Sequence, residues 1–161
     1  MANVSIVCAK LPRRPGRTAW TPDGESLIIA SGGAFYEVSA ATGKVLKRLA
    51  PAYDVSLGRL FWSLSPDGRK IAYVGRRPEP AGCEHTGCEV FALYLQPVTS
   101  SQLKRFADDA GVPGWSPDGR RIVYPSGGRL NVRTLPGGTP ATIVVGDIGV
   151  DPEAPPAWQP R

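Results

Sequence analysis

The sequence predicts an all-β protein built from repeated four-stranded antiparallel units. One phrase occurs three times, as AWTPDGESLII at 19–29, SLSPDGRKIAY at 63–73 and GWSPDGRRIVY at 114–124, and it begins again as AWQPR at 157–161. The 161 residues include 19 glycines and 17 prolines, which indicates many turns. Every amphipathic segment of helical length contains a glycine or proline or alternates like a strand, so helices are not expected.

The spacing of the repeat is typical of a β-propeller blade. The residue two positions before each proline is taken here as the marker of a repeat. The markers are separated by 44, 51 and 43 residues, and the strand after each of the first three ends 11 residues later. A period of roughly 40 to 45 residues containing four short strands is that of a propeller blade. The four markers are Trp20, Leu64, Trp115 and Trp158.

Four strands are expected in each of three blades, which span 18–50, 60–107 and 112–146, because short apolar runs alternate with turn residues there. The expected strands are 18–21, 26–31, 34–39 and 45–49, then 60–64, 70–74, 89–95 and 103–106, then 112–115, 121–125, 129–134 and 141–145. Two further strands, in VSIVCA at 4–9 and PPAWQP at 155–160, have no blade of their own.

Three blades are fewer than the typical count of about four to eight. The whole chain, 1–161, is therefore expected to form a single partial propeller. Two alternatives remain: two copies join as a homodimer into a six-bladed ring, or the two end strands pair into a small fourth blade.

The Pro-Asp-Gly core of the phrase predicts a tight turn between antiparallel strands. Proline fixes φ near −65°, aspartate suits the next position, and glycine supplies a left-handed residue. The marker before each turn is expected to fill the space between neighbouring blades. A catalytic role for the aspartates is disfavoured because equivalent residues recur three times. The turn residues are Pro22, Asp23, Gly24, Pro66, Asp67, Gly68, Pro117, Asp118 and Gly119.

The pattern Trp-Ser-Pro-Asp-Gly, followed by an apolar strand, a short glycine turn and a second strand, resembles the WD40-like (PD40) repeats of TolB-like β-propellers. The resemblance covers about residues 18–160. It implies a non-catalytic scaffold for protein or peptide binding. Related repeats occur in prolyl-oligopeptidase-type enzymes, so the alternative is an accessory propeller of such a hydrolase. The separate hydrolase domain of those peptidases and the N-terminal α/β domain of TolB are not expected in this sequence.

The second blade contains an insertion at 76–88, RRPEPAGCEHTGC, with two cysteines and the single histidine. Three interpretations stay open: a Cys83–Cys88 disulfide, which is favoured, a metal site that adds His85, and free thiols. Propeller insertions emerge on one rim, where repeat proteins commonly bind partners. The candidate partner-binding residues are Arg76, Arg77, Glu79, Glu84 and His85.

No motif for catalysis or cofactor binding is recognisable: a nucleophile elbow, a P-loop and a dinucleotide fingerprint are missing. No cofactor or metal is therefore expected, and the protein is not expected to be an enzyme. The net charge of +5 is spread along the chain without interleaved aromatic residues, which disfavours nucleic acid. No apolar run is long enough for membrane insertion. A disulfide would indicate a periplasmic or extracellular location, although no signal peptide is recognisable.

Overall fold

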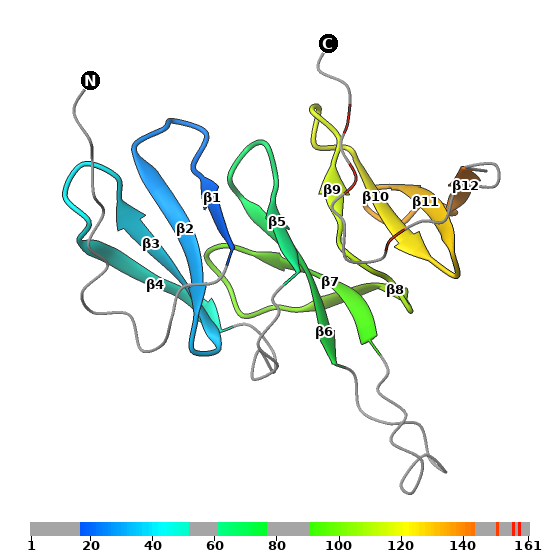
Figure 1. The fold of residues 1–161 in the computed structure, drawn as a ribbon, viewed down its shortest axis with the longest axis horizontal. Coiled ribbons are helices and arrows are strands. Elements are labelled where there is room, and N and C mark those ends of the chain that lie inside the picture. The colour runs from blue at the N-terminus through cyan, green and yellow to red at the C-terminus, as the bar shows by residue number, and fades with distance from the viewer. Residues whose placement is uncertain are drawn as a thin grey trace, which may run out of the picture.

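The computed structural model describes residues 17–51, 61–76 and 91–143, together with Asp151, Pro156 and Trp158. Within these residues the chain forms twelve strands in three four-stranded antiparallel sheets. Figure 1 shows the sheets side by side in chain order, so that blade 2 lies between blades 1 and 3. The predicted all-β class with blade-like sheets is confirmed. No described segment is a helix that could cross a membrane.

Each sheet is a simple meander in which every strand pairs with the next strand along the chain. Blade 1 contains β1 (Thr18–Trp20), β2 (Ser26–Ser31), β3 (Ala34–Ser39) and β4 (Val45–Pro51). Blade 2 contains β5 (Trp62–Leu64), β6 (Lys70–Arg76), β7 (Phe91–Pro97) and β8 (Lys104–Asp108). Blade 3 contains β9 (Gly114–Trp115), β10 (Arg121–Ser126), β11 (Arg129–Thr134) and β12 (Ala141–Ile143).

The four expected strands of blade 2 are present, with bounds that differ from the expected ones by up to two residues. The third strand was expected at 89–95, whereas β7 runs from Phe91 to Pro97. The shift follows from the register, because Lys70 at the start of β6 pairs with Pro97 and Arg76 at its end pairs with Phe91. The segment between β6 and β7, which contains most of the predicted insertion, lies outside the described residues.

Alternate residues of β6 serve the two neighbouring blades, as the period of two in a strand requires. Ile71 and Tyr73 belong to the apolar cluster shared with blade 1. Ala72 belongs to the cluster shared with blade 3. All three side chains are at most 1% exposed. The middle blade is therefore buried on both faces, and the core lies between the sheets.

Four aromatic rings pack together in the cluster that blades 1 and 2 share. The ring of Phe35 on β3 meets Trp62 edge-on with centroids 5.2 Å apart, and it meets Tyr73 at 6.0 Å. Tyr73 in turn lies 5.8 Å from Tyr94 on β7. Edge-to-face pairs of this kind add about 0.5–1.5 kcal/mol beyond the area that they bury.

Blades 2 and 3 are joined by a mixed apolar and cationic contact. Phe106 on β8 meets Tyr124 on β10 at a centroid distance of 6.3 Å. The guanidinium of Arg133 on β11 lies 4.7 Å from the centre of the Phe106 ring and also donates a hydrogen bond to the Phe106 carbonyl. Arg133 therefore fastens the third strand of blade 3 to the outer strand of blade 2.

Candidate functional site

The Pro-Asp-Gly phrase forms the same turn in all three described copies. Gly24, Gly68 and Gly119 have φ angles of 72°, 70° and 67°. Glycine adopts this left-handed region without the penalty that a Cβ atom would impose. The N–H of each glycine donates to the carbonyl three residues earlier, at 2.9, 2.8 and 2.8 Å respectively. The phrase thus builds the hairpin between the first and second strands of each blade.

The aspartate of each turn accepts two hydrogen bonds from its own turn. Asp118 accepts the hydroxyl of Ser116 at 2.5 Å and the N–H of Arg120 at 3.0 Å. Asp23 and Asp67 have the equivalent pair of donors, at 2.6 and 3.0 Å in both cases. The hydroxyl contributes most, and together these bonds hold the pKa of all three carboxyl groups below the ordinary value. The carboxylates therefore stabilise turns.

The serine hydroxyl groups of the turns also form hydrogen bonds within their own turns. Ser116 is fully buried, donates to Asp118 and accepts the N–H of Arg121 at 2.9 Å. Ser65 is 3% exposed and has the same two contacts, with Asp67 and with the N–H of Lys70. A serine buried in this way does not present its oxygen to a substrate.

Neighbouring turns also contact one another. A methyl group added at Gly68 would lie 2.8 Å from Cδ of Pro22, which belongs to the turn of the preceding blade. A methyl group at Gly119 would lie 3.8 Å from Cδ of Pro66. The prolines and glycines of the phrase therefore pack blade against blade, in addition to shaping each hairpin.

Two marker tryptophans bind the preceding blade through the same hydrogen bond. The indole N–H of Trp115 donates to the carbonyl of Ser63 at 3.2 Å, and that of Trp158 donates to the carbonyl of Gly114 at 3.3 Å. Ser63 and Gly114 are the residues immediately before the markers Leu64 and Trp115. Trp158 therefore lies against blade 3 as Trp115 lies against blade 2.

The other two markers are placed differently. Trp20 is 60% exposed, although the sequence predicts that each marker fills the space between two blades. Blade 1 is the first blade of the described chain, so no described blade precedes it and covers this ring. Leu64 is half-buried against the cluster that blades 1 and 2 share. Trp62, two residues earlier, fills that contact and is only 3% exposed.

The predicted partner-binding insertion can be placed only in part. Arg76 is the last residue of β6. The other candidates lie outside the described residues, so the disulfide, the metal site and the rim contact remain predictions. Among the residues that are described, no cluster of histidine, cysteine, aspartate or glutamate could hold a metal ion. The candidates outside the described residues are Arg77, Glu79, Cys83, Glu84, His85 and Cys88.

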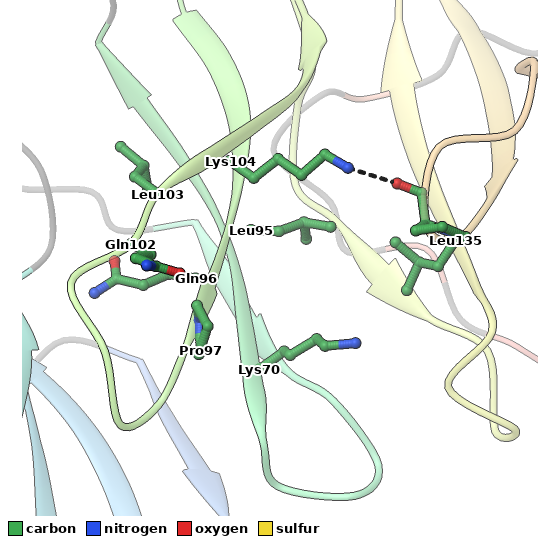
Figure 2. Close-up of a pocket in the computed structure, with 9 residues that line it drawn as sticks. Lys70, Leu95, Gln96, Pro97, Gln102, Leu103, Lys104 and Leu135 are labelled. Atoms are coloured by element: carbon green, nitrogen blue, oxygen red, sulfur yellow. Dashed lines mark hydrogen bonds between the residues drawn. The ribbon is translucent and has the colours of Figure 1, made fainter.

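A pocket of about 560 Å³ lies between blades 2 and 3, and no local pattern in the sequence points to it. Figure 2 shows Lys70, Leu95 and Lys104 extending from blade 2 toward Leu135, which follows β11 in blade 3. The pocket lies at the end of blade 2 where Lys70 pairs with Pro97, opposite to the end where Arg76 pairs with Phe91. Its apolar lining consists of Leu95, Pro97, Leu103, Leu135 and Pro136.

The polar groups of the pocket fix its walls. Lys104 Nζ donates to the carbonyl of Pro136 at 2.9 Å and so bridges the two blades (Figure 2). The side chain of Gln96 is 2% exposed, and its Nε2 donates to the carbonyl of Ser100 at 3.1 Å. This bond anchors the loop that carries Leu103, whose side chain is 36% exposed. The pocket is therefore a defined concavity, and Leu103 is a partly exposed residue of its lining.

Comparison with known proteins gives matches among solved structures only. TolB from Acinetobacter baumannii superposes with a TM-score of 0.53 at 27% identity, over 75% of this chain and 30% of TolB. Porphyromonas gingivalis dipeptidyl peptidase 4 gives a TM-score of 0.57 at 18% identity, over 82% of this chain and 19% of the peptidase.

An oligogalacturonate lyase in complex with manganese gives a TM-score of 0.55 at 12% identity, over 78% of this chain and 39% of the lyase. The fold is that of a TolB-like β-propeller. No family model and no curated protein matches the sequence, so membership of the narrower PD40 class stays a prediction. The TolB-like chain described here spans less than half the length of each of these three proteins.

Proposed function

We propose that this TolB-like chain is a non-catalytic scaffold that binds a protein or peptide segment in the pocket between blades 2 and 3. The observation that carries the proposal is the pocket itself, at about 560 Å³ with mainly apolar walls. Concavities of roughly 300–1,000 Å³ with apolar walls and a few polar groups are typical ligand sites. Leu103, one of the lining residues, supplies an exposed apolar contact of the kind that a partner covers.

The chemistry of the repeated turns supports the non-catalytic part of the proposal. The three aspartates and their hydroxyl partners satisfy one another and the turn backbone. The Trp-Ser-Pro-Asp-Gly pattern also supports placing the repeats in the PD40 class. The alternative, an accessory propeller of a prolyl-oligopeptidase-type hydrolase, has as support a likeness in fold at 18% identity. We therefore favour the binding scaffold over the accessory propeller.

Selection from a displayed random-peptide library on the full chain tests this function. We expect enriched peptides to bind the wild-type chain, and Leu103→Ser to weaken that binding about tenfold, because the change removes roughly 1.5 kcal/mol of apolar contact. Leu46→Ser is the matched control, since Leu46 is also an exposed leucine, 57% exposed, on β4 of blade 1. An absence of enriched peptides, or equal effects of the two substitutions, would contradict the proposal.

A further inference from the structure

We infer that the pocket between blades 2 and 3 selects a peptide segment in which a carboxylate side chain stands beside an apolar one. This inference rests on the proposed binding function and specifies the chemistry of the partner. It comes from the charges of Lys70 and Lys104, the apolar residue between them, and the composition of the remaining wall.

The first step concerns charge. Lys70 and Lys104 are the charged residues among the described lining of the pocket, and both are cationic. Lys104 donates one hydrogen bond to the Pro136 carbonyl, which leaves two of the three donors of its ammonium group for a ligand. Neither lysine forms an ion pair with a carboxylate among the described residues. Lys70 does interact electrostatically with Asp67, but no hydrogen-bonded ion pair has to be broken for an incoming carboxylate to approach the two lysines.

The second step concerns the arrangement of the two lysines. Leu95 pairs with Lys104 across β7 and β8, and with Ala72 across β6 and β7, which puts Leu95 on the same face as Lys70. Figure 2 shows Leu95 between the two lysine side chains, all three directed toward Leu135. An apolar floor with a cation on each side matches an apolar side chain flanked by acidic ones.

The third step separates a peptide from a nucleic acid, which would also be attracted by lysines. Binding of single-stranded nucleic acid combines cationic grooves with aromatic side chains on which bases stack. The described lining contains no aromatic residue, whereas its leucines and prolines suit aliphatic side chains. The observations therefore favour an acidic peptide.

The test repeats the peptide selection on four versions of the full chain: wild type, K70Q/K104Q, K70R/K104R and K47Q. Lys47 is an exposed lysine on β4, so K47Q controls for the loss of one charge away from the pocket. The arginine variant keeps both charges and both donor groups. Two defined probes accompany the library, the labelled peptides Gly-Leu-Glu-Leu-Glu-Gly and Gly-Leu-Gln-Leu-Gln-Gly, together with a ten-nucleotide oligothymidine.

We expect peptides with Glu or Asp next to an apolar residue to be enriched on wild type, K47Q and K70R/K104R. The Glu probe should bind the wild-type chain about tenfold more tightly than the Gln probe. K70Q/K104Q should remove this preference, since each partly exposed ion pair contributes about threefold to fivefold. The K70R/K104R variant guards against a merely structural loss of the Lys104–Pro136 bond.

Four results would overturn the inference. Enriched peptides without acidic residues would leave the proposed function in place but remove its acidic specificity. Equal binding of the Glu probe to K70Q/K104Q and to K47Q would have the same consequence. Tighter binding of the oligothymidine than of the Glu probe would reassign the lysines to phosphate groups. A selection that enriches no peptide on the wild-type chain would remove the proposed function and this inference together.

Discussion

Replacing Trp115 by phenylalanine tests the hydrogen bond that joins neighbouring inner strands. Trp115 is 9% exposed, and its indole N–H donates to the Ser63 carbonyl at 3.2 Å. Losing a hydrogen bond of this kind costs about 0.5–1.5 kcal/mol. The smaller ring loses roughly a further 1–2 kcal/mol of apolar burial, at about 0.8 kcal/mol per methylene equivalent. We therefore expect W115F to lower the free energy of unfolding by about 1.5–3.5 kcal/mol.

Trp62 provides the matched control for this substitution. It is more deeply buried than Trp115, at 3% exposure, but its Nε1 has no hydrogen-bond partner among the residues that the structure describes. W62F removes the same part of a ring without losing a hydrogen bond, and it also removes an unsatisfied buried donor. The cost of W62F should therefore be smaller than that of W115F by at least about 1 kcal/mol.

Urea unfolding followed by far-ultraviolet circular dichroism measures both effects without depending on the fluorescence of the replaced residues. The free energies come from linear extrapolation to zero urea. W158F offers a second instance, because Trp158 makes the equivalent bond to Gly114. If W62F destabilised the chain as much as W115F, burial alone would explain the recurrence of the marker tryptophans, and the proposed role of the indole–carbonyl bond would be wrong.

Three further predictions concern the turns and the first blade. Gly68→Ala should destabilise the chain in a urea titration by at least about 1 kcal/mol more than Gly24→Ala. The φ angle is positive at both positions, but only at Gly68 would the added methyl group meet Pro22, at 2.8 Å. Equal losses of unfolding free energy in the two variants would refute the contact between turns. The pKa of Asp67 is lower in the folded state than in the unfolded state. The stabilisation by its carboxylate is therefore complete above the unfolded pKa of about 3.9 and is lost as the pH falls through the lower, folded value. The urea midpoint of the wild-type chain should drop in this acidic range more than that of Asp67→Asn, and parallel pH profiles of the two would contradict a stabilising role of the carboxylate. We expect the exposed ring of Trp20 to make the chain associate with a second copy, so that light scattering gives twice the 17.1 kDa mass of one chain. Trp20→Ser should return the mass to that of a single chain. A wild-type monomer would exclude the two-copy ring.

The strand pattern could be predicted because it depends on residues that are close to one another in the sequence. Pro-Asp-Gly fixes each hairpin through φ angles that the residues themselves prefer, and the alternation of Ile71, Ala72 and Tyr73 assigns side chains to the two neighbouring blades. Repetition then shows that the blades are equivalent. These features depend on the residues within a few positions of each turn, so no distant contact had to be known.

The pocket and the exposure of Trp20 depend on which segments meet in space, and local pattern does not carry that information. The pocket draws Lys70 from the start of β6, Leu103 from the segment before β8 and Leu135 from the segment after β11, and these are far apart in the chain. Trp20 has the same sequence context as Trp115, and its exposure differs because nothing described precedes blade 1. The contact of Pro22 with Gly68 could be anticipated only after the blades had been placed side by side.

The hydrogen bonds of Trp115 and Trp158 give the row of blades a polarity. The inner strand β9 donates the Trp115 indole N–H to the preceding blade and offers the Gly114 carbonyl to Trp158, so the joint is head-to-tail and has two unlike halves. A repeat copied in tandem would arrive with both halves of the joint and would require no new complementary surface. Growth of such a protein by duplication is therefore structurally undemanding, and any additional blade that joins at Trp20 must present a free main-chain oxygen in the same direction.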